Sequence, residues 1–250
     1  MKKTISVITL IPRSSRFYAE QVQALFRQWA QVHSYSTGDR SVEGIVESDL
    51  YLLSTDAFED AQEARRYVPS DGQVVEIQLT YPKQVIQDLK RIPRGTRVLF
   101  VNATRQMARE AITQLEQLGV NQIGFEPYGP DSPVPEGLDI AVTPDEAGFV
   151  PPGMKKVINI GHRPCTPGTM IEAAIRLGLE GLLEEKQFQN YMKTMASGNY
   201  SFDEMFARSR KMESRFDILL EILDEGMVGV NEKGEVYACN QKAKEITGVN

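Results

Sequence analysis

The sequence predicts an α/β protein built from two Rossmann-like lobes, each a doubly wound parallel sheet covered by helices. Strand-like runs alternate with helical segments along most of the chain, and the strand runs are apolar on both faces, as buried parallel strands are. The pattern restarts after Pro93-Arg94-Gly95. We therefore expect a first lobe at residues 1–93 and a second at 94–195, hinged near residue 94. A single long sheet is the alternative.

The first run begins with a β-rich segment at residues 4–11, followed by apolar residues at helical spacing from residue 16 to residue 32. Pro82 stands where proline is tolerated, in the first turn of a helix. The other predicted elements of this run are strands at 49–55 and 74–79 and helices at 57–68 and 82–92. Parallel strands joined through helices require right-handed crossovers.

The second run opens with an apolar strand at residues 97–101. Thr104 is a suitable N-cap for a helix at 105–118, and Gly119 is a suitable residue just after the end of that helix. Further strands are predicted at 121–125, 138–142 and 156–160, and a further helix at 169–185.

Residues 196–225 are predicted to form a linker and signalling helix. Within 201–224, six positions are spaced by 4, 3, 4, 3 and 4 residues, and all but one are apolar: Met205, Ser209, Met212, Phe216, Leu219 and Leu223. This heptad spacing predicts a homodimer through a two-stranded coiled coil. The alternative is an amphipathic helix packed on its own domain.

Residues 226–250 predict a β-hairpin that turns at Glu232-Lys233-Gly234, followed by the start of a helix at 241–246. A lone hairpin and one helical turn cannot bury a core. We therefore expect the chain to end inside a domain.

The composition is that of an ordinary globular chain. It has 250 residues, 41% hydrophobic and 25% charged, and no apolar run approaches the ~20 residues of a membrane helix. The basic and apolar start has no small-residue cleavage site, and the two cysteines are far apart, so we expect a cytoplasmic protein. The net charge is −6, and the second half of the chain is acidic without a basic stripe. This charge distribution argues against nucleic-acid binding by this segment.

Motifs of common enzyme classes are missing from the sequence. There is no Gly-x-x-x-x-Gly-Lys-Ser/Thr loop, no Gly-x-Gly-x-x-Gly after the first strand and no Gly-x-Ser-x-Gly elbow. With only His33 and His162, a histidine metal cage is impossible, and we expect no metal, no cofactor and no catalytic residues. One alternative is a racemase or isomerase, because Cys165 lies near His162 and Arg163, the residue types that activate a thiolate. The other interpretations of this segment are a binding loop and a plain connection.

Hydroxyl and arginine side chains follow several predicted strands, at the edge where ligands bind in open α/β sheets. Such side chains, with the N–H groups of helix N-termini, suit a carboxylate or phosphate. We therefore expect a small anionic metabolite between the lobes, held by residues from this set: Arg13, Ser14, Ser15, Thr55, Thr80, Tyr81, Asn102, Thr104, Arg105, Tyr128, His162 and Arg163. The alternatives are that these arginines are solvated loop residues, and that the lobes are a dimerisation scaffold without a ligand.

The last 30 or so residues resemble the opening of a PAS domain. The resemblance lies in the helix ending Leu223-Asp224-Glu225-Gly226, the strand 228–230, the turn 232–234, and Asn240, Ala243 and Gly248. The Asp common in that turn is Glu232 here. The resemblance implies ligand binding or dimerisation within a chain of signalling domains.

Residues 1–190 resemble the N-terminal sensory region of the propionate-catabolism regulators, which are sigma-54-dependent transcription activators. The resemblance lies in the strand after Ser48-Asp49, the segment 74–81, a crossover helix with Leu89, and the segment 97–102. The Gly-rich loop of that family is replaced here by Ser54-Thr55-Asp56-Ala57. The resemblance implies a metabolite sensor followed by PAS-like, ATPase and DNA-binding segments, so that DNA and sigma-54 RNA polymerase are contacted only by domains outside this chain.

Overall fold

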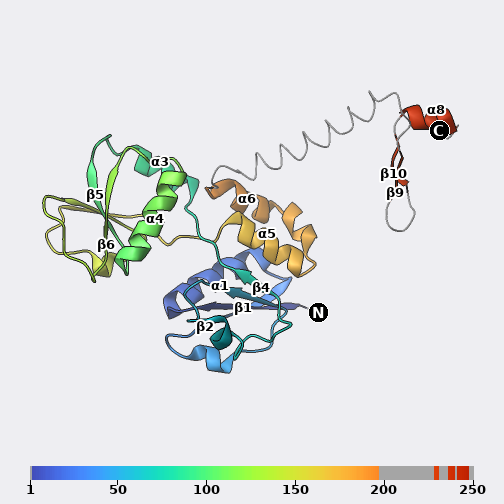
Figure 1. Cartoon of the computed structure of the whole chain (residues 1–250), viewed down its shortest axis with the longest axis horizontal. Helices are drawn as coiled ribbons and strands as arrows, with labels where there is room; N and C mark the ends of the chain where they lie inside the picture. The colour runs from blue at the N-terminus through green and yellow to red at the C-terminus, as the bar shows by residue number, and fades with distance from the viewer. Residues whose placement is uncertain (1, 197–227, 231–235, 240, 248–250) are drawn as a thin grey trace. The chain divides into compact units, whose positions relative to one another are not determined.

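The computed structural model describes residues 2–196, 228–230, 236–239 and 241–247. The chain forms two compact units, Met1–Asn199 and Tyr200–Asn250, and each is described by itself. The first unit contains two separate four-stranded sheets with helices beside them (Figure 1). The predicted α/β class with two Rossmann-like lobes is therefore confirmed, and the single long sheet is excluded.

The first sheet has the order β2-β1-β3-β4, and all of its pairings are parallel. Its strands are β1 (Lys3–Thr9), β2 (Ala30–Ser36), β3 (Leu50–Leu53) and β4 (Val74–Glu76). The prediction of one helix from residue 16 to residue 32 was wrong, because α1 (Pro12–Phe26) ends early and β2 follows. Arg27 adopts a positive φ of 34°, its N–H donates to the carbonyl of Gln23, and the chain then turns into the edge strand.

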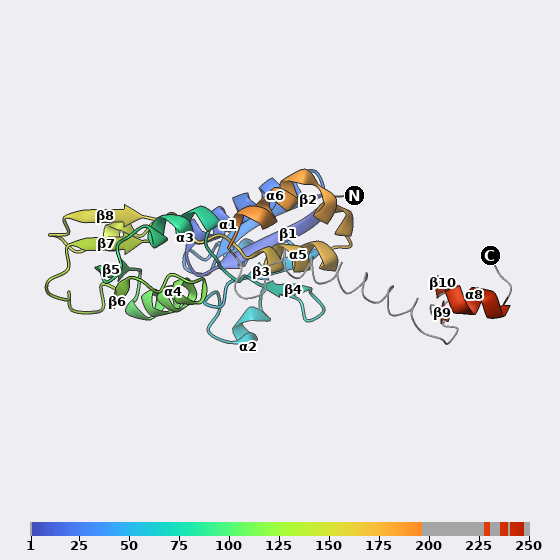
Figure 2. The ribbon, with the colours of Figure 1, turned by 90° about the horizontal axis from the view of Figure 1, so that it is seen from above.

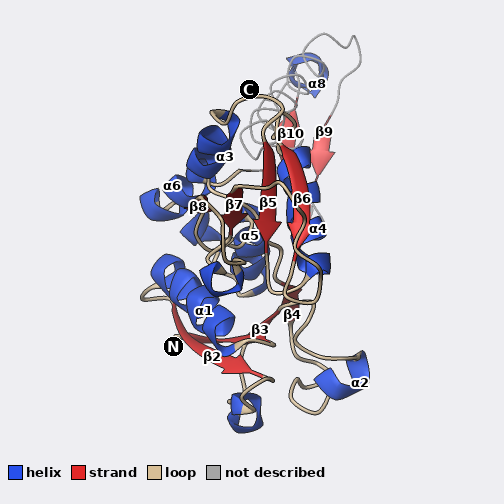
Figure 3. Cartoon of the chain, turned by 90° about the vertical axis from the view of Figure 1, so that its left-hand side faces the viewer, coloured by secondary structure: helices blue, strands red, loops and turns tan. Residues whose placement is uncertain are grey.

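The second sheet repeats this order as β6-β5-β7-β8, again with parallel pairings (Figure 3). Its strands are β5 (Arg97–Val101), β6 (Gly124–Tyr128), β7 (Ile140–Thr143) and β8 (Lys156–Asn159). The strand predicted at 121–125 lies later in the chain, and it includes Pro127. A proline is tolerated there because β6 is an edge strand.

Some helices of the first unit pack on the sheet of the other sequence half. The core of the first sheet contains Met170 of α5 (Pro167–Arg176) and Phe188 of α6 (Lys186–Thr194). The core of the second sheet contains Ile86 and Leu89 of α3 (Lys83–Lys90), together with α4 (Arg105–Gln117). Figures 1 and 2 show α5 and α6 beside the first sheet and α3 and α4 beside the second. Judged by core packing, α3 therefore belongs to the second lobe, and α5 and α6 belong to the first. The predicted boundaries 1–93 and 94–195 assign these three helices the other way round.

Two helix predictions differ from the structure in length. The helix predicted at 57–68 is reduced to the four-residue α2 (Ala61–Ala64). The helix predicted at 169–185 is interrupted, because α5 ends before Gly178, which has a φ of 66°, and a 3₁₀ turn (Glu180–Glu184) follows. By contrast, Thr104 caps α4 as predicted, its hydroxyl accepting from the Met107 N–H at 3.1 Å, and Gly119 has the positive φ expected after the helix end.

The lobes are joined where adjacent chain segments cross between them. The Thr80 N–H donates to the Pro164 carbonyl at 2.8 Å, and the Ala196 N–H donates to the Tyr81 carbonyl at 2.7 Å. Arg94, by contrast, lies in the turn just before β5. The junction between the lobes therefore lies at these crossing segments, whereas the sequence predicted a hinge near residue 94.

In the second unit, β9 (Val228–Val230) and β10 (Val236–Cys239) pair antiparallel, which confirms the predicted hairpin strands. The helix α8 (Gln241–Thr247) follows, as predicted. The predicted heptad helix at 201–224 and the turn at 232–234 lie outside the described residues. Within the described part of the chain, no helix has the length and apolar character needed to cross a membrane.

Candidate functional site

A cavity of about 650 Å³ lies between the two lobes, at the carboxyl ends of both sheets. Its first-lobe wall includes Thr9, which ends β1, and Thr55, which follows β3. Its second-lobe wall includes Asn102 and Pro144, which follow β5 and β7. β1 and β3 are neighbours in the first sheet, and β5 and β7 are neighbours in the second. The strand order reverses between the two strands of each pair, and open α/β sheets bind ligands at such topological switch points. The cavity thus joins the switch points of both sheets.

The amino end of α1 borders the cavity through Ile11 and Ser14. Pro12 occupies the first turn, and Ile11 at the N-cap position makes no side-chain cap hydrogen bond. The first-turn N–H groups of this helix therefore keep their partial positive charge, which lies on the cavity side.

Arg163 is anchored on the second-lobe side of the cavity. Its Nη2 donates to Oε1 of Gln114 at 2.7 Å, and its Cζ lies 5.4 Å from the ring centroid of Tyr81. The amide nitrogen of Gln114 in turn donates to the Leu79 carbonyl, which fixes the position of the amide. The Arg163 Nε is buried and has no hydrogen-bond partner among the described residues. Apart from the bond to Gln114, the Nη groups of Arg163 make no hydrogen bond to a described residue, so N–H groups of the guanidinium fork remain for a carboxylate.

A second group, the Asp145 cluster, consists of Arg13, Asp145, Asn159 and His162. Arg13 of α1 donates to the Asp145 carboxylate, so this ion pair joins the two lobes. The other Asp145 oxygen accepts from Nδ2 of Asn159 at 2.9 Å, and Nε2 of His162 lies 2.8 Å from the carboxylate. The Asn159 hydrogen bond is the main reason that the pKa of Asp145 is lowered, and the charges of His162 and Arg13 add to it. Burial lowers the pKa of His162, although Asp145 opposes this change.

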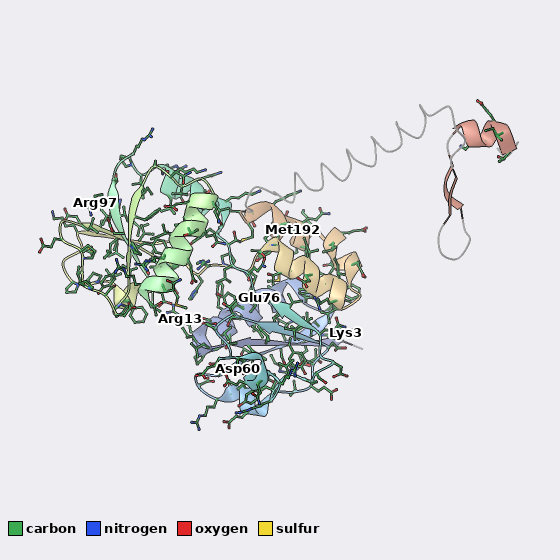
Figure 4. All side chains as sticks on the ribbon, viewed as in Figure 1. Lys3, Arg13, Asp60, Glu76, Arg97 and Met192 are labelled. Carbon is green, nitrogen blue, oxygen red and sulfur yellow. The ribbon has the colours of Figure 1, made fainter. Side chains whose placement is uncertain are left out.

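Four carboxylates also line the cavity. Asp56 and Glu76 belong to the first lobe, and Glu110 and Glu146 belong to the second. Figure 4 shows both Glu76 and Arg13 on the side of the first lobe that faces the second lobe. Burial raises the pKa of Glu146, which is half-buried, whereas the other three are exposed to the solvent in the cavity.

Five of the predicted site residues line the cavity together: Ser14, Thr55, Asn102, His162 and Arg163. Arg13 and Tyr81 contact residues of the site, through Asp145 and Arg163 respectively.

The other five predicted residues do not line the cavity. The Ser15 hydroxyl donates to the Pro12 carbonyl, Thr80 is buried and donates to the Ala196 carbonyl, and Thr104 caps α4. Arg105 is exposed outside the cavity, and Tyr128 is buried against Leu99 and Leu138. Tyr128 is absent from the site because β6 is the edge strand, away from the switch point.

Several site residues were missed by the sequence analysis. Glu76 and Gln78 escaped it because β4 ends at Glu76, whereas the strand was predicted to continue to residue 79. Glu146 lies after β7 and could have been found by the strand-end rule. Glu110 and Gln114 lie on one face of α4, and no local signal indicates that this face borders the cavity.

Cys165 does not line the cavity. It is fully buried in the core of the first sheet, and its backbone N–H donates to Oε1 of Gln21. Burial raises the pKa of its thiol to about 12, so the thiol stays protonated at neutral pH. The activated thiolate that the racemase alternative requires is therefore not supported.

Within the described residues, no group of three or more His, Cys, Asp or Glu side chains is placed to hold a metal ion. Comparisons with models of protein families, with curated proteins and with solved structures find no match to this chain.

Proposed function

We propose that this chain is the ligand-sensing region of a bacterial transcriptional activator. A small metabolite binds between the lobes, and the resulting change passes through residues 201–224 to output domains. The resemblance to the propionate-catabolism regulators suggests that those domains are PAS-like, ATPase and DNA-binding segments. DNA and sigma-54 RNA polymerase are then contacted only outside this chain.

The observation that carries the ligand-binding part of this proposal is the cavity at the joined switch points. Its volume of about 650 Å³ lies within the ~300–1,000 Å³ that small-molecule sites occupy. Arg163 supplies a fixed cation there, and hydroxyls of Ser14 and Thr55 supply further hydrogen-bonding groups. This open cavity favours a ligand-binding module over a ligand-free scaffold, whose lobes would meet in a closed contact.

Thermal unfolding of the purified chain tests ligand binding. The panel contains organic acids, phosphates, amino acids and amines. A ligand present at 100 times its Kd stabilises by about 2.7 kcal/mol, which raises the Tm of a chain of this size by roughly 5–10 °C. Arg163→Gln is expected to remove most of this increase, whereas Arg105→Gln, an exposed arginine outside the cavity, is the matched control. The absence of any shift, or equal shifts in both variants, would contradict the proposal.

The relay part of the proposal has its own tests. Light scattering after gel filtration is expected to show a dimer, and Leu219→Asp within the heptad spacing is expected to give a monomer. The DNA downstream of the codon for Asn250 is expected to encode an ATPase domain. A monomeric native chain would contradict the dimer, and an unrelated downstream reading frame would contradict the regulatory layout.

A further inference from the structure

The charge of the cavity differs from what a simple anion requires. Asp56, Glu76, Glu110 and Glu146 line it, and none of them forms an ion pair with another described residue. Among the described lining residues, one guanidinium, that of Arg163, stands against these carboxylates. The lining is therefore negative overall, and a ligand bearing several negative charges would be repelled by most of it.

Two of the four carboxylates lie on the lobe opposite Arg163. Arg163 is held on the second-lobe side by Gln114 of α4 and by the ring of Tyr81, which belongs to the core of the second sheet. Asp56 follows β3, and Glu76 ends β4, so both belong to the first lobe. Glu110 and Glu146 share the second-lobe wall with Arg163. A ligand that spans the cavity therefore meets the cation only on the second-lobe wall, and on the first-lobe wall it meets carboxylates alone.

We propose that the ligand is a small zwitterion of the amino-acid class, whose carboxylate binds Arg163 and whose ammonium group binds Asp56 and Glu76. This inference rests on the proposed function and names the chemical class of its ligand. Bidentate hydrogen bonds from a guanidinium suit a carboxylate, and an ammonium group donates three hydrogen bonds that carboxylate oxygens accept. Because its two ends are held by different lobes, such a ligand favours the closed arrangement of the lobes over the open one.

The test compares ligands that differ in one charged group. The purified chain is titrated by calorimetry with each of the common amino acids, and with di- and tricarboxylates, inorganic phosphate and polyamines. For each amino acid that binds, the probe set adds the matched carboxylic acid without the amino group and the matched amine without the carboxylate. We expect an amino acid to bind at least tenfold more tightly than either of its matched analogues.

Variants then assign each end of the ligand. Glu76→Gln and Asp56→Asn are expected to reduce the preference for the amino acid over its des-amino analogue about tenfold, without weakening the analogue. Arg163→Gln is expected to reduce the preference over the matched amine instead. Glu47→Gln, which changes an exposed glutamate of the first lobe outside the cavity, is the matched control and is expected to change neither preference.

The outcomes separate this inference from the proposed function. If a polycarboxylate, phosphate or polyamine binds and the amino acids do not, the zwitterion is refuted and the ligand-binding proposal stands. The same holds if the des-amino analogue binds as tightly as the amino acid, or if Glu76→Gln and Asp56→Asn leave the preference unchanged. If no compound of any class binds, both proposals fail.

Discussion

Replacing Asp145 by asparagine tests whether the Asp145 cluster ties the lobes together. The carboxylate accepts from Arg13 of the first lobe and from Asn159, and it lies 2.8 Å from Nε2 of His162. An amide in place of this carboxylate would keep the shape of the side chain and would remove its charge. The substitution therefore isolates the electrostatic part of the interaction.

The expected loss of stability in Asp145→Asn follows from how exposed the side chains of the Asp145 cluster are. Arg13 has 62% of its side chain exposed, so its ion pair contributes about 0.2–1 kcal/mol. Asp145 and His162 are each 25% exposed, and their contact at 2.8 Å contributes up to about 1 kcal/mol, as partly exposed charged contacts do. We expect Asp145→Asn to lower the free energy of unfolding by about 1–2 kcal/mol and the Tm by roughly 2–8 °C.

The pH dependence gives a sharper test. Burial lowers the pKa of His162 in the folded protein, so below about pH 6.5 the unfolded chain binds more protons and stability falls as the pH falls. Asp145 stays ionised in this range because its own pKa is lowered, and its charge attracts the imidazolium. Asp145→Asn removes that attraction. The pKa of His162 is then expected to fall further, and the loss of stability between pH 7 and pH 5 is expected to increase.

NMR titration of the imidazole signals measures this directly. The chain has two histidines, His33 and His162, and His162→Gln identifies which signal belongs to which. Asp139→Asn is the matched control, because it removes a carboxylate whose ion pair with Lys155 is exposed. An unchanged or higher titration midpoint for His162 in Asp145→Asn would refute the reasoning. So would a loss of Tm no larger than that of the control.

Three further predictions concern the core and the junction. Phe188→Ala is expected to lower the free energy of unfolding by about 3–5 kcal/mol in denaturant titrations, because Phe188 is fully buried against the first sheet. Cys165 is expected to resist iodoacetamide at pH 8 in the native chain and to react in urea, as judged by peptide mass spectrometry, because its thiol is buried and protonated. Thr80→Val is expected to cost about 1–3 kcal/mol in the same denaturant titrations, because the Ala196 carbonyl loses the 2.6 Å hydrogen bond from the Thr80 hydroxyl.

The fold class could be predicted because it depends on local patterns. Strands apolar on both faces indicate a parallel sheet, and Thr104 and Gly119 mark the ends of α4 through backbone chemistry that acts over a few residues. The edge strands were the difficult ones. Polar side chains interrupt β2, and β6 contains Pro127, so neither has the apolar run that marked the central strands.

The exchange of helices could not be predicted from the sequence. The apolar face of α3 shows that the helix packs on a sheet, and nothing in residues 83–90 distinguishes one parallel sheet from another. The residues of the candidate site could likewise be predicted only in part. The strand-end rule located Thr55, Asn102 and Arg163, whereas the cavity-facing side of α4 depends on how the lobes meet.

The exchange of helices between the lobes also brings the cavity close to Ala196, through which a bound ligand would act under the proposed function. Ala196, the last residue described there, donates to the Tyr81 carbonyl, and its own carbonyl accepts from the Thr80 hydroxyl. The ring of Tyr81 lies under Arg163, which lines the cavity. A ligand that draws Arg163 toward the first lobe therefore acts on the segment to which Ala196 is bonded. Under the proposed function, differential binding to the open and closed lobes would therefore act on the last described residue of the first unit through two hydrogen bonds.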